Sequence, residues 1–154
     1  MIPEQNSKVV VLLGPVTAAT NADSTNYFDT LGYDYAVIDV AVPAATATNS
    51  SAKLQVLSLT EGDTTSSFAA FGTFTGTTNT TAAATEFVIP VWNNTSLGGV
   101  HRFYIDLRAR KRYIKIADRP AASHTIIYST VSLSRAETAP DTDTERGVMV
   151  SVTG

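Results

Sequence analysis

The sequence predicts an all-β fold: an antiparallel two-sheet β-sandwich, jelly-roll or immunoglobulin-like, with eight or nine short strands and extended loops. Short apolar or alternating runs recur along the 154 residues, each bounded by Gly, Pro, Asn, Asp or Thr. No stretch carries the apolar stripe of an amphipathic helix. Thr, Ser and Ala together make up roughly a third of the chain, and Thr favours strands.

The predicted strands follow one another at the spacing of a sandwich. They are Lys8–Leu13, Tyr33–Val42, Lys53–Thr60, Phe68–Phe74, Glu86–Trp92, Val100–Arg108, Arg112–Ala117, His124–Leu133 and Gly147–Val152. Turn residues separate them about every 8 to 15 residues, which is typical of antiparallel sheets and not of a parallel sheet with crossover helices. The pattern leaves the order of the strands open.

The strand Tyr33–Val42 has one face that we expect to be core. Side chains alternate between the two faces of a strand, so every second residue points the same way. The predicted core face carries Asp34, Ala36, Ile38, Val40 and Val42.

Residues Val100–Ala117 are predicted to form one antiparallel hairpin with its tip near Ala109–Lys111. On each strand, apolar residues such as Ile105 and Ile114 alternate with charged ones such as Arg102. One face of this hairpin is therefore expected to contact water or a partner.

The chain is expected to be a single domain spanning residues 1–154. Residues 1–7 are a candidate extended N-terminal arm, and Gly14–Asn26 is expected to connect the first strand to the second. Polar composition predicts three longer loops, the last of which is acidic. These loops are Ala44–Ala52, Gly76–Thr85 and Arg135–Arg146.

Charge is distributed unevenly. The formal net charge is −3, yet residues 100–119 carry a net charge of about +5, which leaves about −8 on the rest of the chain. Such asymmetry suits a surface that binds acidic protein, including other copies of the chain. The candidate protein interface is Arg102, Arg108, Arg110, Lys111, Arg112 and Lys115.

The basic segment has two other interpretations. The first is a solvated face balanced by local carboxylates, as most runs of charge are. The second is nucleic-acid binding, which normally comes with a basic balance over the whole domain; the sequence pI of about 5.2 speaks against it. We therefore expect no nucleic-acid partner.

The residues that usually carry catalysis are missing or badly spaced. There is no Cys, and the two histidines, His101 and His124, lack zincin spacing. The alternating acids from Asp141 to Glu145 lack the glycine and distal glutamate of a calcium loop. No nucleophile elbow, Walker loop or dinucleotide fingerprint occurs. We expect no enzyme activity, no cofactor and no metal.

Nothing in the sequence predicts contact with a membrane. The apolar run Val9–Leu13 is far shorter than the roughly 18 residues that would cross a bilayer. The first residues lack the basic start and apolar core of a secretory signal, and the absence of Cys fits synthesis in a reducing cytoplasm. We expect no membrane partner.

Three stretches together resemble proteins of tailed bacteriophages and prophages. They are Leu54–Asp63, Phe103–Ile116, which is the most specific, and Leu133–Pro140. The resemblance implies a virion component synthesised in the host cytoplasm. Among such components, a small β-sandwich without Cys is most often a capsid decoration (cement) protein.

A decoration protein binds the major capsid protein on the head surface, usually as a homotrimer, and stabilises the shell. The resemblance therefore implies that Arg108, Arg110 and Arg112 pair with carboxylates of the capsid protein or of a neighbouring copy. The alternative is a receptor- or glycan-binding domain of a head spike, neck or tail. Sugar platforms need exposed aromatic rings, and the positions of Trp92, Tyr104 and Tyr113 predict only an incomplete one.

Overall fold

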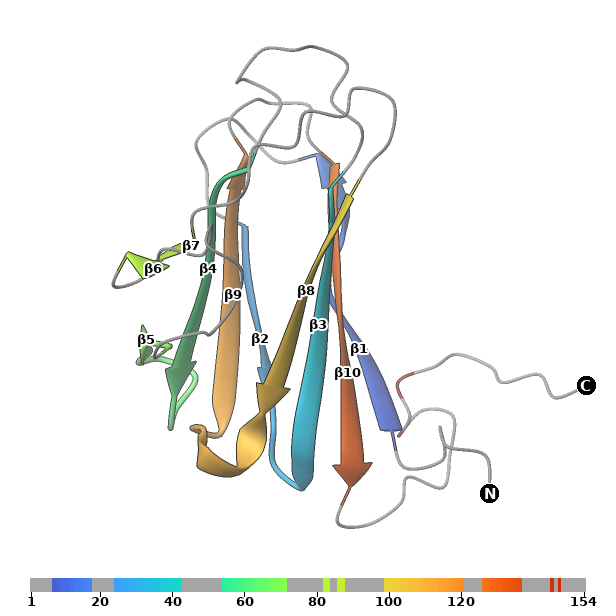
Figure 1. The fold of residues 1–154 in the computed structure, drawn as a ribbon, viewed down its shortest axis with the longest axis vertical. Helices are drawn as coiled ribbons and strands as arrows, with labels where there is room; N and C mark the ends of the chain where they lie inside the picture. The colour runs from blue at the N-terminus through green and yellow to red at the C-terminus, as the bar shows by residue number, and fades with distance from the viewer. Residues whose placement is uncertain are drawn as a thin grey trace, which may run out of the picture.

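The structure is a computed structural model, in which two antiparallel sheets of four strands each face one another (Figure 1). The only described helix is one short 3₁₀ turn. Among the described residues, no helix has the length and hydropathy to cross a membrane. The residues that the structure describes are 7–17, 24–42, 54–71, 82–83, 86–87, 99–120, 126–136, 145 and 147.

Sheet A has the strand order β1-β10-β3-β8. Its strands are β1 (Ser7–Thr17), β10 (Ile126–Ala136), β3 (Tyr33–Val42) and β8 (Gly99–Asp106). The pairing register shifts along β1 between Val11 and Leu13, so the alternation breaks there and both Leu12 and Leu13 are buried.

Sheet B has the strand order β2-β9-β4-β5. Its strands are β2 (Ser24–Asp29), β9 (Tyr113–Pro120), β4 (Leu54–Gly62) and β5 (Ala69–Ala70). A separate short ladder pairs β6 (Ala82–Ala83) with β7 (Glu86–Phe87). The amide of Asn26 on β2 donates a 2.6 Å hydrogen bond to the carbonyl of Leu12, which ties the two sheets together along one side.

The core lies between the sheets and is built from their inward side chains. The predicted core face of β3 is confirmed for Ala36, Ile38 and Val40, which are at most 1% exposed. It is wrong for Asp34, whose charged side chain is 43% exposed and pairs with Arg135, and the side chain of Val42 lies outside the described part of the structure. In sheet B, Ile114 and Ile116 of β9 are fully buried as well. Full burial of such a side chain stabilises the fold by about 1.5–3 kcal/mol. The fold is therefore an all-β, two-sheet structure, as the alternating pattern predicts.

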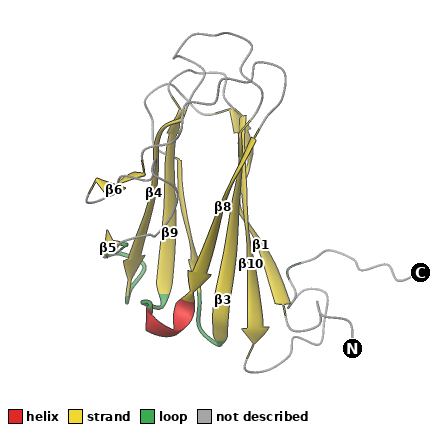
Figure 2. Cartoon of the chain, in the orientation of Figure 1, coloured by secondary structure: helices red, strands yellow, loops and turns green. Residues whose placement is uncertain are grey.

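The predicted hairpin Val100–Ala117 is wrong. β8 pairs with β3 in sheet A, whereas β9 pairs with β2 and β4 in sheet B. Residues Leu107–Arg112, here called the β8–β9 arch, cross from one sheet to the other, beginning with the 3₁₀ turn (red in Figure 2). In a hairpin the apolar residues of both strands would share one face of one sheet. The crossing lets them face each other across the core instead.

The sequence also misses β2. Gly14–Asn26 is expected to be a connection, but it contains the end of β1 and the start of β2. Only Phe28 is buried in β2, so this strand has too little apolar alternation to be recognised.

The other predicted segments are described only in part. Of Phe68–Phe74 the described strand is β5, and of Glu86–Trp92 it is β7. Of the loop Arg135–Arg146, the first two residues belong to β10 and Glu145 lies in a turn. Of Gly147–Val152 only Gly147 is described, also in a turn. The segments outside the described residues are residues 1–6 of the arm, Ala44–Ala52, and most of Gly76–Thr85 apart from β6.

Candidate functional site

The structure separates the six predicted interface residues into three places. Arg102 lies on β8, on the face of sheet A that points away from the core. The β8–β9 arch carries Arg108, Arg110, Lys111 and Arg112. Lys115 lies on the outward face of β9 in sheet B. They therefore do not form one continuous basic surface.

Arg102 is paired across the strands of sheet A. Its Nε and Nη2 donate to the two carboxylate oxygens of Asp39, at 2.6 and 2.7 Å. The two residues stand directly opposite each other on β8 and β3. This bidentate pair raises the pKa of the Arg102 guanidinium and leaves it with a carboxylate already bound.

Arg108 is paired within the arch itself. The Asp106 carboxylate accepts the backbone N–H of Arg108 at 3.1 Å and two guanidinium hydrogen bonds at 2.9 and 2.5 Å. It thereby caps the 3₁₀ turn. The Arg108 guanidinium and backbone N–H lower the pKa of Asp106 to about 2.

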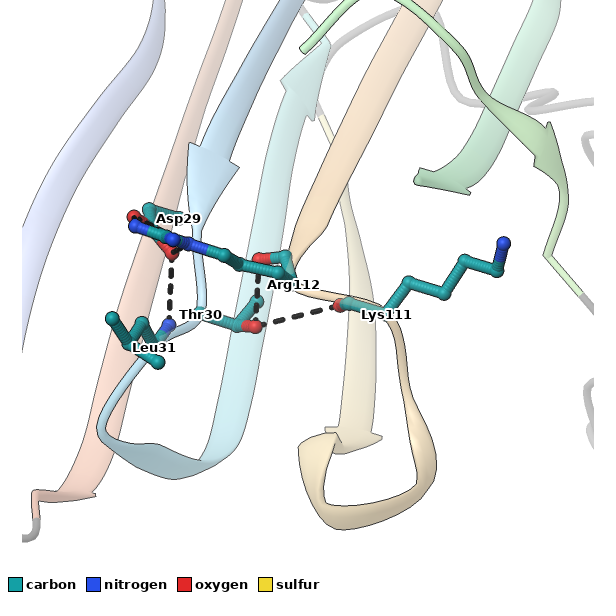
Figure 3. A network of polar contacts seen from close by, with 5 residues as sticks. All are labelled: Asp29, Thr30, Leu31, Lys111 and Arg112. Carbon is teal, nitrogen blue, oxygen red and sulfur yellow. Dashed lines mark hydrogen bonds and ion pairs between the residues drawn. The ribbon is translucent and has the colours of Figure 1, made fainter. Parts of the chain in front are cut away.

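The turn between β2 and β3 holds the end of the arch (Figure 3). The guanidinium of Arg112 contacts the carboxylate of Asp29, with Nη2 2.8 Å from Oδ2, and lowers the pKa of that carboxyl. The backbone N–H and the hydroxyl of Thr30 each donate a 2.8 Å hydrogen bond to the carbonyl of Arg112. Asp29 also accepts the N–H of Leu31 at 3.0 Å, so this carboxylate orders both the turn and the arch.

The remaining basic residues of the arch turn toward the end of β4. The ammonium of Lys111 is 2.9 Å from an oxygen of Asp63, and its backbone N–H donates to Glu61 at 3.3 Å. Arg110 lies 3.6 Å from Glu61, with its guanidinium 4.5 Å from the centre of the Phe71 ring. The arch therefore bridges the ends of both sheets.

Five of the six predicted interface residues thus bind carboxylates of the same chain. This arrangement favours the alternative interpretation of the basic segment, in which it is a solvated face whose charges are balanced by carboxylates of the same chain. The pairs with Asp39, Asp29 and Asp63 join residues 63, 83 and 48 positions apart in the sequence, so inspecting neighbouring residues could not find them.

Lys115 differs from the other five. Its ammonium lies 4.6 Å from the centre of the Phe68 ring, and among the described residues no carboxylate forms an ion pair with it. Two tyrosines complete an aromatic cluster, defined here as Tyr27, Phe68 and Tyr113. The Tyr27 ring centre is 6.2 Å from that of Phe68 and 6.1 Å from that of Tyr113. Sequence reasoning missed Tyr27 and Phe68 because no local pattern joins them to β9.

A glycine allows Phe68 to reach this cluster. A Cβ atom on Gly62 would collide with the carbonyl oxygen of Ser67, so the loop after β4 folds back against Gly62 at a distance that only glycine permits. Beyond Phe68 the chain pairs again with β4 through β5, and the N–H of Phe71 donates to the carbonyl of Leu59 at 3.3 Å. Phe71 is buried in the core, so the loop is anchored on both sides of Phe68.

The outer face of sheet A has a different character. Tyr104 on β8 stands opposite Val37 on β3, and it is 73% exposed. The large apolar side chains exposed on this face are Val11, Val100, Tyr104 and Tyr128. They surround the Arg102–Asp39 pair, whose charges cancel. A face of this kind suits contact with another protein surface better than it suits chemistry.

The described residues contain no group of three or more His, Cys, Asp or Glu side chains arranged to hold a metal ion. His101 is half-buried, and burial lowers the pKa of its imidazole. His124 and most of the acidic run that ends at Glu145 lie outside the described residues.

The described part of the chain therefore presents two contrasting outer sheet faces and one charge-paired end. Exposed apolar side chains gather on sheet A, and an aromatic cluster with one cation gathers on sheet B. Comparisons with protein-family models, with curated proteins and with solved structures found no match to this chain.

Proposed function

We propose that the protein is a structural virion protein of a tailed bacteriophage, a decoration (cement) protein that docks on the major capsid protein through the outer face of sheet A. The resemblance of three stretches to phage virion proteins supports the assignment to a virion. In this proposal the protein is a jelly-roll or immunoglobulin-like sandwich of eight or nine strands. It lies on the head surface and has no catalytic activity.

One observation carries the choice of surface. Four of the six large apolar side chains that the described residues expose lie on the outer face of sheet A. Single exposed apolar residues are ordinary on any protein, but several on one flat face indicate a surface that another protein covers. The bidentate Arg102–Asp39 pair in their midst needs no charged partner, so it permits close contact.

The size of this face indicates how firmly one copy can bind. Four strands about 4.8 Å apart and about 27 Å long present roughly 500 Å² of flat surface, against about 800 Å² per partner in a standard stable interface. One face alone therefore supports weak docking. A homotrimer would present three such faces and bind a lattice of capsid proteins by avidity.

The predicted basic interface becomes the weaker hypothesis for docking. A guanidinium that already binds a carboxylate must give up that partner before it can bind another, so the net gain is small. This holds for Arg108 with Asp106 and for Arg112 with Asp29. We therefore expect Tyr104, and not the arch, to dominate binding.

The test is binding to phage heads purified without this protein, scored by co-sedimentation and by imaging. Tyr104→Glu places a charge on the outer face of the edge strand β8, at a position that is 73% exposed, and we expect it to weaken binding about tenfold or more. Thr25→Glu is the matched control, because it places the same charge on an exposed position of sheet B. It should bind like the wild type.

Two outcomes would overturn the proposal. If the wild-type protein does not bind the heads, the decoration role is wrong. If Tyr104→Glu binds normally while replacing Arg108, Arg110 and Arg112 by Ala abolishes binding, docking uses the arch and not sheet A. Light scattering of the purified protein tests the trimer separately, and a monomer would contradict that part.

A further inference from the structure

The outer face of sheet B carries a second surface with its own chemistry. The aromatic cluster brings together three rings from three separate segments: β2, β9 and the loop after β4. Tyr27 is 45% exposed, and Phe68 and Tyr113 are half-buried. An aromatic ring with one exposed face and the other face packed against the protein can stack on the C–H face of a sugar ring. The tyrosine hydroxyls can form hydrogen bonds with the polar groups of the sugar.

Lys115 adds one charge to this surface. The other basic residues between positions 102 and 115 all have carboxylate partners, whereas Lys115 rests on the Phe68 ring alone among the described residues. A ring holds an ammonium in place without neutralising it. The Lys115 ammonium is therefore positioned at the aromatic cluster and remains available to an anionic ligand.

The count of charges decides which anionic ligand fits. A nucleic-acid strand has a phosphate at every nucleotide and needs a row of unneutralised cations. Here the nearest basic residues, Lys111 and Arg112, already bind Asp63 and Asp29. Those exposed carboxylates would also repel a chain of phosphates. The Arg112 guanidinium also lies 5.1 Å from the centre of the Tyr113 ring, but Asp29 neutralises it. Three rings beside a single cation that has no carboxylate partner among the described residues match a ligand that combines sugar rings with a carboxylate.

We infer that the outer face of sheet B binds a carboxylated saccharide, with its sugar ring on Tyr27, beside Tyr113, and its carboxylate on Lys115. The loop that folds back against Gly62 fixes Phe68 under the Lys115 ammonium before the ligand arrives, which lowers the cost of ordering the site. This inference does not depend on the proposed docking. The outer faces of the two sheets point in opposite directions in Figure 1, so both can be occupied at once.

The test is an NMR titration of the full chain with two acidic probes, 3′-sialyllactose and trigalacturonic acid. The neutral counterparts are lactose and galactotriose. We expect at least one acidic probe to shift the signals of Tyr27, Tyr113 and Lys115, and to bind about tenfold or more tightly than its neutral counterpart. A ten-nucleotide oligothymidylate serves as the competing ligand class.

Matched variants separate the contributions. Lys115→Gln should abolish the preference for the acidic probe, while Lys115→Arg should keep it. Lys111→Gln is the control, because it removes a charge that Asp63 already neutralises. Tyr27→Ala should weaken all saccharides about tenfold, whereas Tyr104→Ala on the opposite sheet should not change binding. The spectrum of each variant shows directly whether it is folded.

Three results would overturn the inference. The first is the absence of shifts at the aromatic cluster with both acidic probes. The second is equal binding of acidic and neutral sugars by wild type and by Lys115→Gln. The third is tighter binding of oligothymidylate than of any saccharide at the same residues, which would identify a nucleic-acid site.

Discussion

The β8–β9 arch and the outer face of β9 are adjacent in the sequence and similarly basic, but they place their charges differently. In the arch, Lys111 and Arg112 bind carboxylates that come from other segments. Lys115, on β9, contacts the Phe68 ring and forms no ion pair with any described carboxylate. The difference shows that the basic residues of a run are free to bind a partner only where the fold places no carboxylate of the same chain beside them.

The two regions also differ in what holds them. The ion pairs of the arch are largely exposed, and such pairs usually contribute about 0–1 kcal/mol each. Burial of Leu107 and the hydrogen bonds of Thr30 fix the arch more firmly. The aromatic cluster depends instead on the backbone approach at Gly62. Substitutions at these positions test the comparison directly.

The largest effect is expected from Leu107→Ala in the arch. Leu107 is 5% exposed, and a buried leucine cut back to alanine typically costs about 2–5 kcal/mol. Urea unfolding at pH 7 measures the change. Val100→Ala, at a position 60% exposed, should stay within about 0.5 kcal/mol. Equal losses for both variants would show that Leu107 does not anchor the arch.

Gly62→Ala should disturb the aromatic cluster and leave the arch in place. The added methyl group requires the backbone at Ser67 to move, which we expect to lower the free energy of unfolding by about 1–3 kcal/mol. Proton contacts between Tyr27 and Phe68 should disappear from NMR spectra. Gly14→Ala is the control, since a Cβ there meets no atom within 4 Å. Retained contacts in Gly62→Ala would contradict the role given to this glycine.

Thr30→Val replaces the hydroxyl that contacts the carbonyls of Arg112, at 2.8 Å, and Lys111, at 3.5 Å, by a methyl group of similar size. The carbonyl of Arg112 would keep the bond from the Thr30 backbone N–H, so a loss of about 0.5–1.5 kcal/mol is expected. Urea unfolding beside Thr25→Val, at an exposed position on β2, the strand that ends next to Thr30, isolates the effect. A stability equal to that of wild type would mean that the backbone bond suffices.

Asp29→Asn should have the smallest effect, and one that depends on pH. Because the fold lowers the pKa of Asp29 below its usual 3.8, the carboxylate stabilises the protein above about pH 4, and this contribution is lost as the pH falls through the lowered value. Both side chains of the pair are over 40% exposed, so the difference at pH 7 should be less than about 1 kcal/mol. Urea unfolding at pH 7 and at a series of lower pH values checks it. A difference between the two proteins that stays constant over the whole series would exclude the ion pair as its cause.

The sequence predicts strands well where inward residues are strongly apolar and alternate, as in β3, where Ala36, Ile38 and Val40 are buried as predicted. It fails where a strand buries a single side chain, as β2 buries Phe28. It also fails at the arch, because alternation shows which side of a strand faces the core and not which sheet the strand joins. Sheet membership depends on pairing with distant segments.

The candidate sites illustrate the same limit. The basic residues can be found by inspection, but their partners cannot, since Asp29 and Arg112 are 83 positions apart. Phe68 reaches Lys115 only because the chain folds back at Gly62. A single glycine in the sequence does not predict such a loop. Long-range contacts therefore decide which charges are neutralised and which remain available.

The pairing of β1 with β10 has a consequence for how the chain is made. Ser7 stands opposite Ser134, so β1 cannot join its neighbouring strand until all the residues between them have been synthesised. Sheet A therefore closes late, by contacts that are far apart in sequence and slow to form. Until then the apolar residues of β1 remain exposed to other nascent chains, and the yield of folded protein should depend on how quickly β10 arrives.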